Sequence, residues 1–164
     1  MNHNVEHFGG CLCGEVRYKA LGQPKIKGVC HCRYCQLRSG SAFGVLAYFL
    51  EENFLISAGT LGSYNFKSES DNSWNNEFCQ NCGTTVLSRL EVFPGMVGIM
   101  GGTFDPPTFW YDLDAEVFVR SKAHFVGNIE ALKHEDTFFS HDPKRAESKR
   151  LEGSEMTSES CLLG

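Results

Sequence analysis

The chain has 164 residues, of which 41% are hydrophobic and 21% are charged, so it is long enough for one globular domain with an apolar core. Its longest apolar run, residues 43–50, is far shorter than the ~20 residues of a membrane span, and residues 1–20 contain no signal-peptide-like run. We therefore expect a soluble, cytoplasmic protein with reduced cysteines. The net charge of −5, without a broad basic face, argues against nucleic acid as a partner.

The predicted elements are mostly short strands. In residues 15–20, Val16, Tyr18 and Ala20 alternate with charged residues, as in a half-buried strand. Further strands are predicted at residues 43–50, 62–68, 84–90, 96–100 and 115–120, and turns or loops at residues 57–62, 70–76, 93–95 and 104–107. Short helices are expected after Cys35 and near residues 127–135. The pattern indicates a mainly β, mostly antiparallel fold with short helical segments.

The end of the chain differs in composition. From residue 142 onward the sequence is rich in Lys, Arg, Glu and Ser and has few core-forming residues until its last four. Such a composition buries too little apolar surface to fold alone. We therefore expect residues 5–141 to form the domain and residues 142–164 to form a flexible tail or a weak helix. Cys161 in this tail is interpreted as an incidental thiol.

Two close cysteine pairs lie far apart in the sequence. Cys11 and Cys13 form a C-x-C pair, and Cys79 and Cys82 form a C-x-x-C pair followed by Gly83, which suits a tight turn. In a reduced protein, two such pairs are typical of a closed zinc site with four thiolate ligands that joins distant strands. Two disulfides or four buried free cysteines are the alternatives.

A second cysteine group has one ligand fewer. Cys30, Cys32 and Cys35 lie within six positions, and a zinc ion with three protein ligands leaves its fourth position for water or substrate. Three thiolates make the metal a poor generator of hydroxide and better suited to a further sulfur ligand. A thiol held there as thiolate would be ready to attack an electrophilic carbon. Alternatively, His31 or another side chain closes the site and makes it structural.

Basic residues surround the three-cysteine group. Residues 16–50 contain six basic residues and no acidic residue. This stretch is either an ordinary solvated surface or a site that receives a small anion.

Several motifs occur in the order seen in one protein family. They are GGCLCGEVRY, CHCRYCQLRSGSAFG, LGSYNF, FCQNCGTTV and GGTFDPP, and together they span residues 9–107. On these residues the sequence resembles the glutathione-dependent formaldehyde-activating enzyme family, also called the S-(hydroxymethyl)glutathione synthase or centromere-protein-V-like family. The resemblance implies an Mss4-like fold of packed antiparallel sheets with two zinc ions. It implies a structural zinc on Cys11, Cys13, Cys79 and Cys82, and a catalytic zinc on Cys30, Cys32 and Cys35. We expect the second zinc to be the more labile one, because three thiolates leave an exchangeable position.

The activity that the resemblance implies is that of a carbon–sulfur lyase or synthase, which condenses formaldehyde or a related aldehyde with the thiol of glutathione. Glutathione with an ionised thiol is a dianion, so Arg33 and Arg38, together with Lys25 and Lys27, are candidates to bind its carboxylates.

No general base can be assigned from the sequence, because His31 and His124 are only candidates. Two other functions stay open. One is a zinc-stapled protein-interaction module without catalytic activity, and the other is a metal-handling or zinc-sensing protein.

Overall fold

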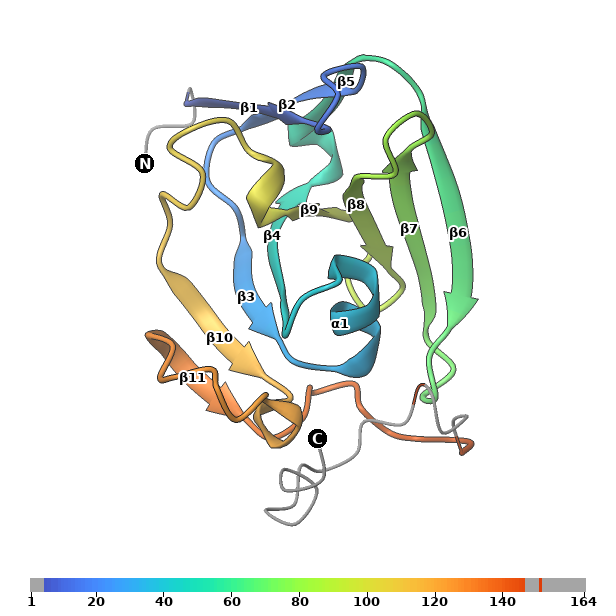
Figure 1. Ribbon diagram of the computed structural model, residues 1–164, viewed down its shortest axis with the longest axis vertical. Helices are drawn as coiled ribbons and strands as arrows, with labels where there is room; N and C mark the ends of the chain where they lie inside the picture. The colour runs from blue at the N-terminus through green and yellow to red at the C-terminus, as the bar shows by residue number, and fades with distance from the viewer. Residues whose placement is uncertain (1–4, 147–150, 152–164) are drawn as a thin grey trace.

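The computed structural model describes residues 5–146 and residue 151. Within these residues the chain forms two β-sheets and one α-helix (Figure 1). The smaller sheet has the strand order β1-β2-β5, and the larger has the order β11-β10-β3-β4-β9-β8-β7-β6. The elements are β1 (Glu6–Gly10), β2 (Arg17–Leu21), β3 (Ile26–Cys30), α1 (Arg33–Ser39), β4 (Gly44–Leu50), η1 (Glu51–Asn53), β5 (Phe54–Ala58), β6 (Leu61–Lys67), β7 (Ser73–Cys79), β8 (Thr85–Leu90), β9 (Met96–Met100), η2 (Gly101–Thr103), β10 (Leu113–Val117), η3 (Val119–Ser121) and β11 (Ala131–Glu135).

The main core lies between the two sheets. The alternation predicted for residues 15–20 is confirmed, because Val16, Tyr18 and Ala20 are all fully buried. They pack in one cluster with residues of the central strands of the larger sheet, which include Ala47, Phe49, Val86, Leu87, Val97 and Ile99. The smaller sheet therefore covers one face of the larger sheet at its middle.

Strand β4 is apolar on both faces because both faces are covered. Ala47 and Phe49 face the core between the sheets, whereas Leu46 and Tyr48 belong to a second cluster that contains Cys32 and other residues around α1. Successive side chains of a strand point to opposite faces, so a strand covered on both sides reads as one continuous apolar run. The run at residues 43–50 is thus a central strand that separates the main core from the region of α1 (Figure 1).

The mainly β fold class is confirmed, but several segments differ from the sequence prediction. Residues 127–135 are predicted to be helical, yet Ala131–Glu135 forms strand β11. Residues 70–76 are predicted as a loop, yet Ser73–Cys79 forms β7 between β6 and β8. In both cases the edge of a neighbouring strand offers backbone hydrogen-bond partners, which outweighs the weak local preference. Strands β1, β3 and β5 are also present without having been predicted.

Strand β10 is shorter than predicted and pairs in parallel. It ends at Val117, and η3 follows from Val119. It pairs in parallel with both β3 and β11, whereas every other pairing between the named strands of the described residues is antiparallel. The expectation of a mostly antiparallel fold therefore holds except at this edge of the larger sheet.

Residues 142–146, the described start of the predicted tail, lie against the β6–β7 turn. The Lys144 amide donates to the Glu69 carbonyl over 2.8 Å, and the Asp142 amide donates to Ser70 Oγ over 3.0 Å. Cys161 and most of residues 147–164 lie outside the described part of the chain. The domain boundary at residue 141 stays a prediction.

Among the residues that the structure covers, no helix has the length and apolar character needed to cross a membrane.

Candidate metal centres and active site

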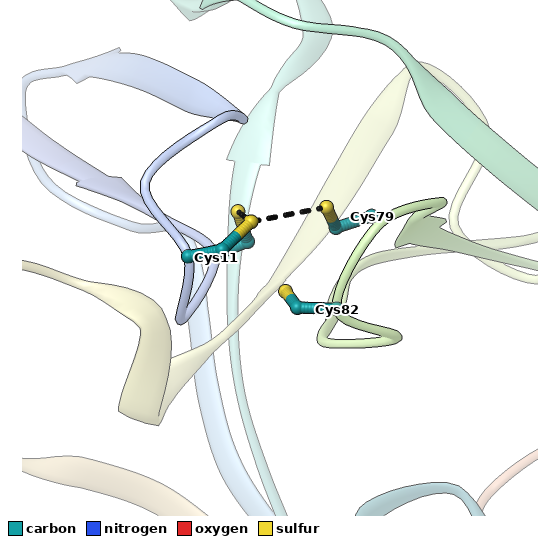
Figure 2. A group of neighbouring side chains, drawn as sticks. Cys11, Cys79 and Cys82 are labelled. Atoms are coloured by element: carbon teal, nitrogen blue, oxygen red, sulfur yellow. Dashed lines mark hydrogen bonds between the residues drawn. The ribbon is translucent and has the colours of Figure 1, made fainter.

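Four cysteine side chains converge where the smaller sheet meets the β7–β8 turn. Their Sγ atoms all lie within 4.8 Å of one another. The group consists of Cys11 and Cys13 in the loop between β1 and β2, Cys79 at the end of β7, and Cys82 in the turn that follows. Figure 2 shows Cys11 facing the turn that carries Cys79 and Cys82. The structure thus brings together the two pairs that the sequence places far apart.

Both loops that carry these cysteines are tight turns closed by backbone hydrogen bonds. The Gly14 amide donates to the Cys11 carbonyl over 3.0 Å, and the Gly83 amide donates to the Cys79 carbonyl over 2.9 Å. Gly14 and Gly83 have φ angles of 79° and 73°, a left-handed conformation that glycine adopts without steric cost. The glycines therefore let each cysteine pair lie on a turn of only a few residues.

The spacing of these sulfurs fits a tetrahedral metal site. Cys13 Sγ lies 3.4 Å from Cys11 Sγ and 3.8 Å from Cys79 Sγ. A zinc ion with Zn–S bonds of ~2.3 Å holds its ligands ~3.8 Å apart, whereas a disulfide requires ~2.05 Å. Hydrogen bonds from the hydroxyl and the amide of Thr84 lower the pKa of Cys82 to about 5, which favours the thiolate that a metal needs. This four-cysteine group can hold a metal such as zinc.

The second group, here called the three-cysteine group, lies where β3 passes into α1. Cys30 is the last residue of β3, Cys32 caps the N-terminus of α1, and Cys35 lies within the helix. Their Sγ atoms also lie within 4.8 Å of one another. The Cys35 amide donates a hydrogen bond to Cys32 Sγ, so the start of the helix holds the sulfur of Cys32 in place. The group can hold a metal through three protein ligands.

Arg38 places a positive charge beside the three-cysteine group. Its guanidinium donates hydrogen bonds to Cys35 Sγ over 3.3 Å and to Asn76 Oδ1 on β7 over 3.4 Å, and it lies 5.3 Å from the centre of the Trp74 ring. Hydrogen bonds from the other two cysteines, together with the charge of Arg38, hold the pKa of Cys35 well below its usual range. These interactions favour the thiolate form of Cys35 over the thiol.

His31 does not lie among the three sulfurs. Its ring is fully buried, and its Nε2 lies 2.9 Å from Glu116 Oε1 on β10. Glu116 is 1% exposed and also accepts from Lys122 Nζ and His134 Nδ1, each over 2.7 Å. Burial raises the pKa of Glu116, but these three partners outweigh burial and lower it. The structure thus directs His31 toward the buried carboxylate of Glu116, a residue that the sequence analysis did not single out.

The remaining residues named from the sequence lie in different surroundings. Arg33 begins α1 and is half-buried. Lys27 forms an ion pair of 2.8 Å with Asp114 Oδ1, so its charge is already paired within the protein. Lys25 is exposed. His124 is exposed as well. Of the four cations considered for anion binding, Arg33 and Arg38 lie on α1, and Arg38 contacts a cysteine of the group directly.

A cavity of about 130 Å³ is lined in part by the three cysteines of the second group. Most of its wall is apolar, and its aromatic lining residues are Tyr34, Tyr48, Trp74, Phe93, Phe118 and Phe138. Its polar lining comes from the β6–β7 turn and from residues 140–141. These residues belong to several strands and loops, so no local sequence pattern could have revealed the cavity.

Replacing Arg38 with glutamine should weaken metal binding at the three-cysteine group. Loss of the guanidinium raises the pKa of Cys35, and protons then compete better with the metal for the sulfur. We expect a chelator to remove metal from this group severalfold faster, with no change at the four-cysteine group. Arg33→Gln removes a charge from the other end of the same helix and is the control. Equal acceleration in both variants would contradict a specific role for Arg38.

Comparisons with known proteins bear on the same residues. The sequence profile described as glutathione-dependent formaldehyde-activating enzyme (GFA) matches residues 6–121. A protein of Schizosaccharomyces pombe (strain 972), named as an uncharacterized lyase, is 30% identical over 82 residues, which are 49% of this chain and 56% of that relative. The match therefore spans little more than half of the relative's length.

A crystal structure of a Rhodobacter sphaeroides protein aligns with a TM-score of 0.49 and 20% sequence identity, and the alignment covers 63% of this chain and 95% of that one.

The profile match extends over more than two thirds of the chain and includes both cysteine groups. The chain belongs to the glutathione-dependent formaldehyde-activating enzyme family and has the Mss4-like fold of that family.

Proposed function

We propose that the protein is a carbon–sulfur lyase that condenses formaldehyde or a related aldehyde with the thiol of glutathione at the three-cysteine group. The observation that supports this function most directly is that three neighbouring sulfurs line a cavity. A group with four protein ligands would have no coordination position for a substrate. The family of the chain and the lyase name of its yeast relative point to the same class of reaction.

Zinc suits both cysteine groups, and we propose different roles for the two ions. Four thiolates from Cys11, Cys13, Cys79 and Cys82 saturate a tetrahedral ion, so this site is structural. Cys30, Cys32 and Cys35 would hold a second ion with one position free for substrate. When bound there, zinc supplies a soft Lewis acid that holds a substrate thiol as thiolate.

The cations of α1 are proposed to orient the thiol substrate. Arg38, beside Cys35, offsets part of the negative charge that three thiolates create. Arg33 and Arg38 are the groups that we assign to the carboxylates of glutathione, because a guanidinium binds a carboxylate through two parallel hydrogen bonds.

The proposed addition is balanced without a further reactant. The sulfur forms a bond to the carbonyl carbon, and the π bond of the carbonyl breaks. The oxygen takes up the proton that the thiol released, so no oxidant or reductant is consumed. The reverse reaction cleaves the carbon–sulfur bond, which is the lyase direction.

The two metal sites should differ in how readily they lose zinc. After mild chelation we expect the purified protein to keep about one zinc per chain, because the saturated four-thiolate site exchanges slowly whereas a three-thiolate site has an open position. Metal analysis measures the number of zinc ions per chain. Added glutathione should slow the loss of the second ion. Equal and rapid loss of both ions would contradict the assignment of different roles.

The activity itself is tested by nuclear magnetic resonance exchange spectroscopy with glutathione and formaldehyde. The zinc-loaded protein should accelerate the exchange between the aldehyde and S-hydroxymethylglutathione, and Cys32→Ser should return the rate to that of the uncatalysed reaction. A folded protein with two bound zinc ions and no such acceleration would refute the enzyme function and favour the protein-interaction module.

A further inference from the structure

The cavity beside the three-cysteine group has a wall of aromatic rings. Tyr48 and Phe93 lie with their ring centres 4.6 Å apart, and Phe93 lies 5.7 Å from Phe138. On another part of the wall, Tyr34 and Trp74 lie 5.9 Å apart. All of these residues line the same space as the three cysteines. A molecule that reacts at the sulfurs can therefore place an apolar group against these rings.

The size of the cavity suits a single ring. Its volume is about 130 Å³, and an apolar protein cavity of ~150 Å³ binds benzene. Formaldehyde has one carbon atom and would leave most of this space unused. A one-carbon aldehyde alone does not account for the cavity.

The charges around the cavity do not suit glutathione itself. The ionisable side chains in its lining, apart from the cysteines and tyrosines, are Glu69 and His141, which pair with each other over 3.1 Å. His141 also contacts Arg120 over 2.9 Å. No lysine or arginine lines the cavity among the described residues, so a carboxylate placed inside would lose its hydration without gaining a cation. We therefore expect the carboxylates of glutathione to lie outside this cavity while its thiol reaches the three-cysteine group.

We propose that the aldehyde substrate of this protein carries an aromatic ring, and that the ring binds in this cavity while the carbonyl carbon faces the three-cysteine group. This inference rests on the proposed function and names the class of its second substrate. The bond changes are those of the formaldehyde reaction. The thiol sulfur bonds to the carbonyl carbon, the carbonyl π bond breaks, and the oxygen takes the thiol proton.

Part of this wall is contributed by residues beyond the family match. Phe138, Ser140 and His141 line the cavity, whereas the family profile ends at residue 121. The Ser140 carbonyl accepts a hydrogen bond of 3.4 Å from Asn72 Nδ2 in the β6–β7 turn, which holds this segment over the cavity. The segment after β11 therefore contributes the ring of Phe138 to the cavity wall, and this ring lies outside the region that the family profile matches.

The experiment uses phenylacetaldehyde as the reactive probe and 2-phenylethanol as a probe that binds without reacting. Exchange spectroscopy with glutathione compares phenylacetaldehyde with formaldehyde, and calorimetry measures 2-phenylethanol. We expect the wild-type protein to accelerate hemithioacetal exchange more with phenylacetaldehyde than with formaldehyde, relative to each uncatalysed rate. We also expect 2-phenylethanol to bind to the wild type and to Cys32→Ser alike, because its ring needs the cavity and not the metal.

Two pairs of variants locate the ring. Ala115 lines the cavity, so Ala115→Phe should fill it and abolish binding of 2-phenylethanol, whereas Ala58→Phe makes the same change on exposed β5 and should have no effect. Phe138→Ala should weaken binding about threefold to tenfold, the usual effect of one aromatic contact. Phe125→Ala is its control, because Phe125 is 71% exposed and does not line the cavity. Circular dichroism verifies that each variant is folded.

The outcomes separate this inference from the proposed function. Suppose that the wild type accelerates exchange with formaldehyde but not with phenylacetaldehyde, and that Ala115→Phe leaves the formaldehyde rate unchanged. This result would overturn the aromatic substrate and leave the proposed function intact. Absence of acceleration with either aldehyde would overturn the proposed function, and with it the assignment of the ring to an aldehyde, even if 2-phenylethanol binds. Binding of 2-phenylethanol that is equal in wild type and Ala115→Phe would overturn the placement of the ring.

Discussion

Replacing Cys79 with serine is expected to unfold the domain or to remove most of its free energy of unfolding. Cys79 belongs to the group of sulfurs that joins the β1–β2 loop to the β7–β8 turn. Structural zinc in small peptides binds with an apparent free energy of about 10–16 kcal/mol, which is comparable to the about 5–15 kcal/mol that separates the folded from the unfolded state of a typical domain. Thermal melting followed by circular dichroism measures the loss.

Cys32→Ser is the matched control, because it also removes one sulfur from a cysteine group. Cys32 caps α1 by accepting a hydrogen bond from the Cys35 amide, and serine is among the preferred residues at this position of a helix. We therefore expect near-native secondary structure and a melting temperature within a few degrees of the wild type, with loss of the second zinc. If Cys32→Ser melts as early as Cys79→Ser, the three-cysteine group is structural and the proposed catalytic role fails.

Replacing Glu116 with alanine should destabilise the protein by about 3–5 kcal/mol, the usual cost of removing one partner from a buried ion pair. The substitution leaves the buried ring of His31 and the Lys122 ammonium without their acceptor. Urea unfolding at neutral pH with zinc present measures the change. His134→Ala is the control, since His134 is 44% exposed and its loss should cost less than about 1 kcal/mol. A similar cost for both variants would contradict the role of Glu116 as the centre of this network.

The contribution of Glu116 should also depend on pH. Its pKa is lowered in the folded protein, so folding favours the ionised carboxylate. The stability from this shift is full above the unfolded pKa of about 4.3 and is lost as the pH falls through the folded pKa. The difference in unfolding free energy between the wild type and Glu116→Gln should therefore shrink below about pH 4. A difference that grows on acidification would contradict the assigned direction.

The sequence by itself indicated the features that depend on short-range patterns. The alternation of Val16, Tyr18 and Ala20 marks a strand with one buried face, because side chains of a strand alternate between its two faces. The spacing within each cysteine pair and within the three-cysteine group is equally local, since a turn of a few residues brings those sulfurs together, whereas only the tertiary structure brings the two pairs into one four-cysteine group. The mainly β class and the family both follow from such patterns, and both are confirmed.

The features that the sequence missed depend on contacts between distant segments. Strand β11 has residues that favour a helix, and it is extended because the free edge of β10 supplies its hydrogen bonds. The pairing of β10 with β3 places Glu116 against His31, 85 positions earlier in the chain, and a buried acid in a strand gives no signal of its partner. The cavity likewise requires Tyr34, Trp74 and Phe138 from three separate segments. Tertiary structure alone determined these features, because burial and pairing energies are set by which surfaces meet and not by the residues next along the chain.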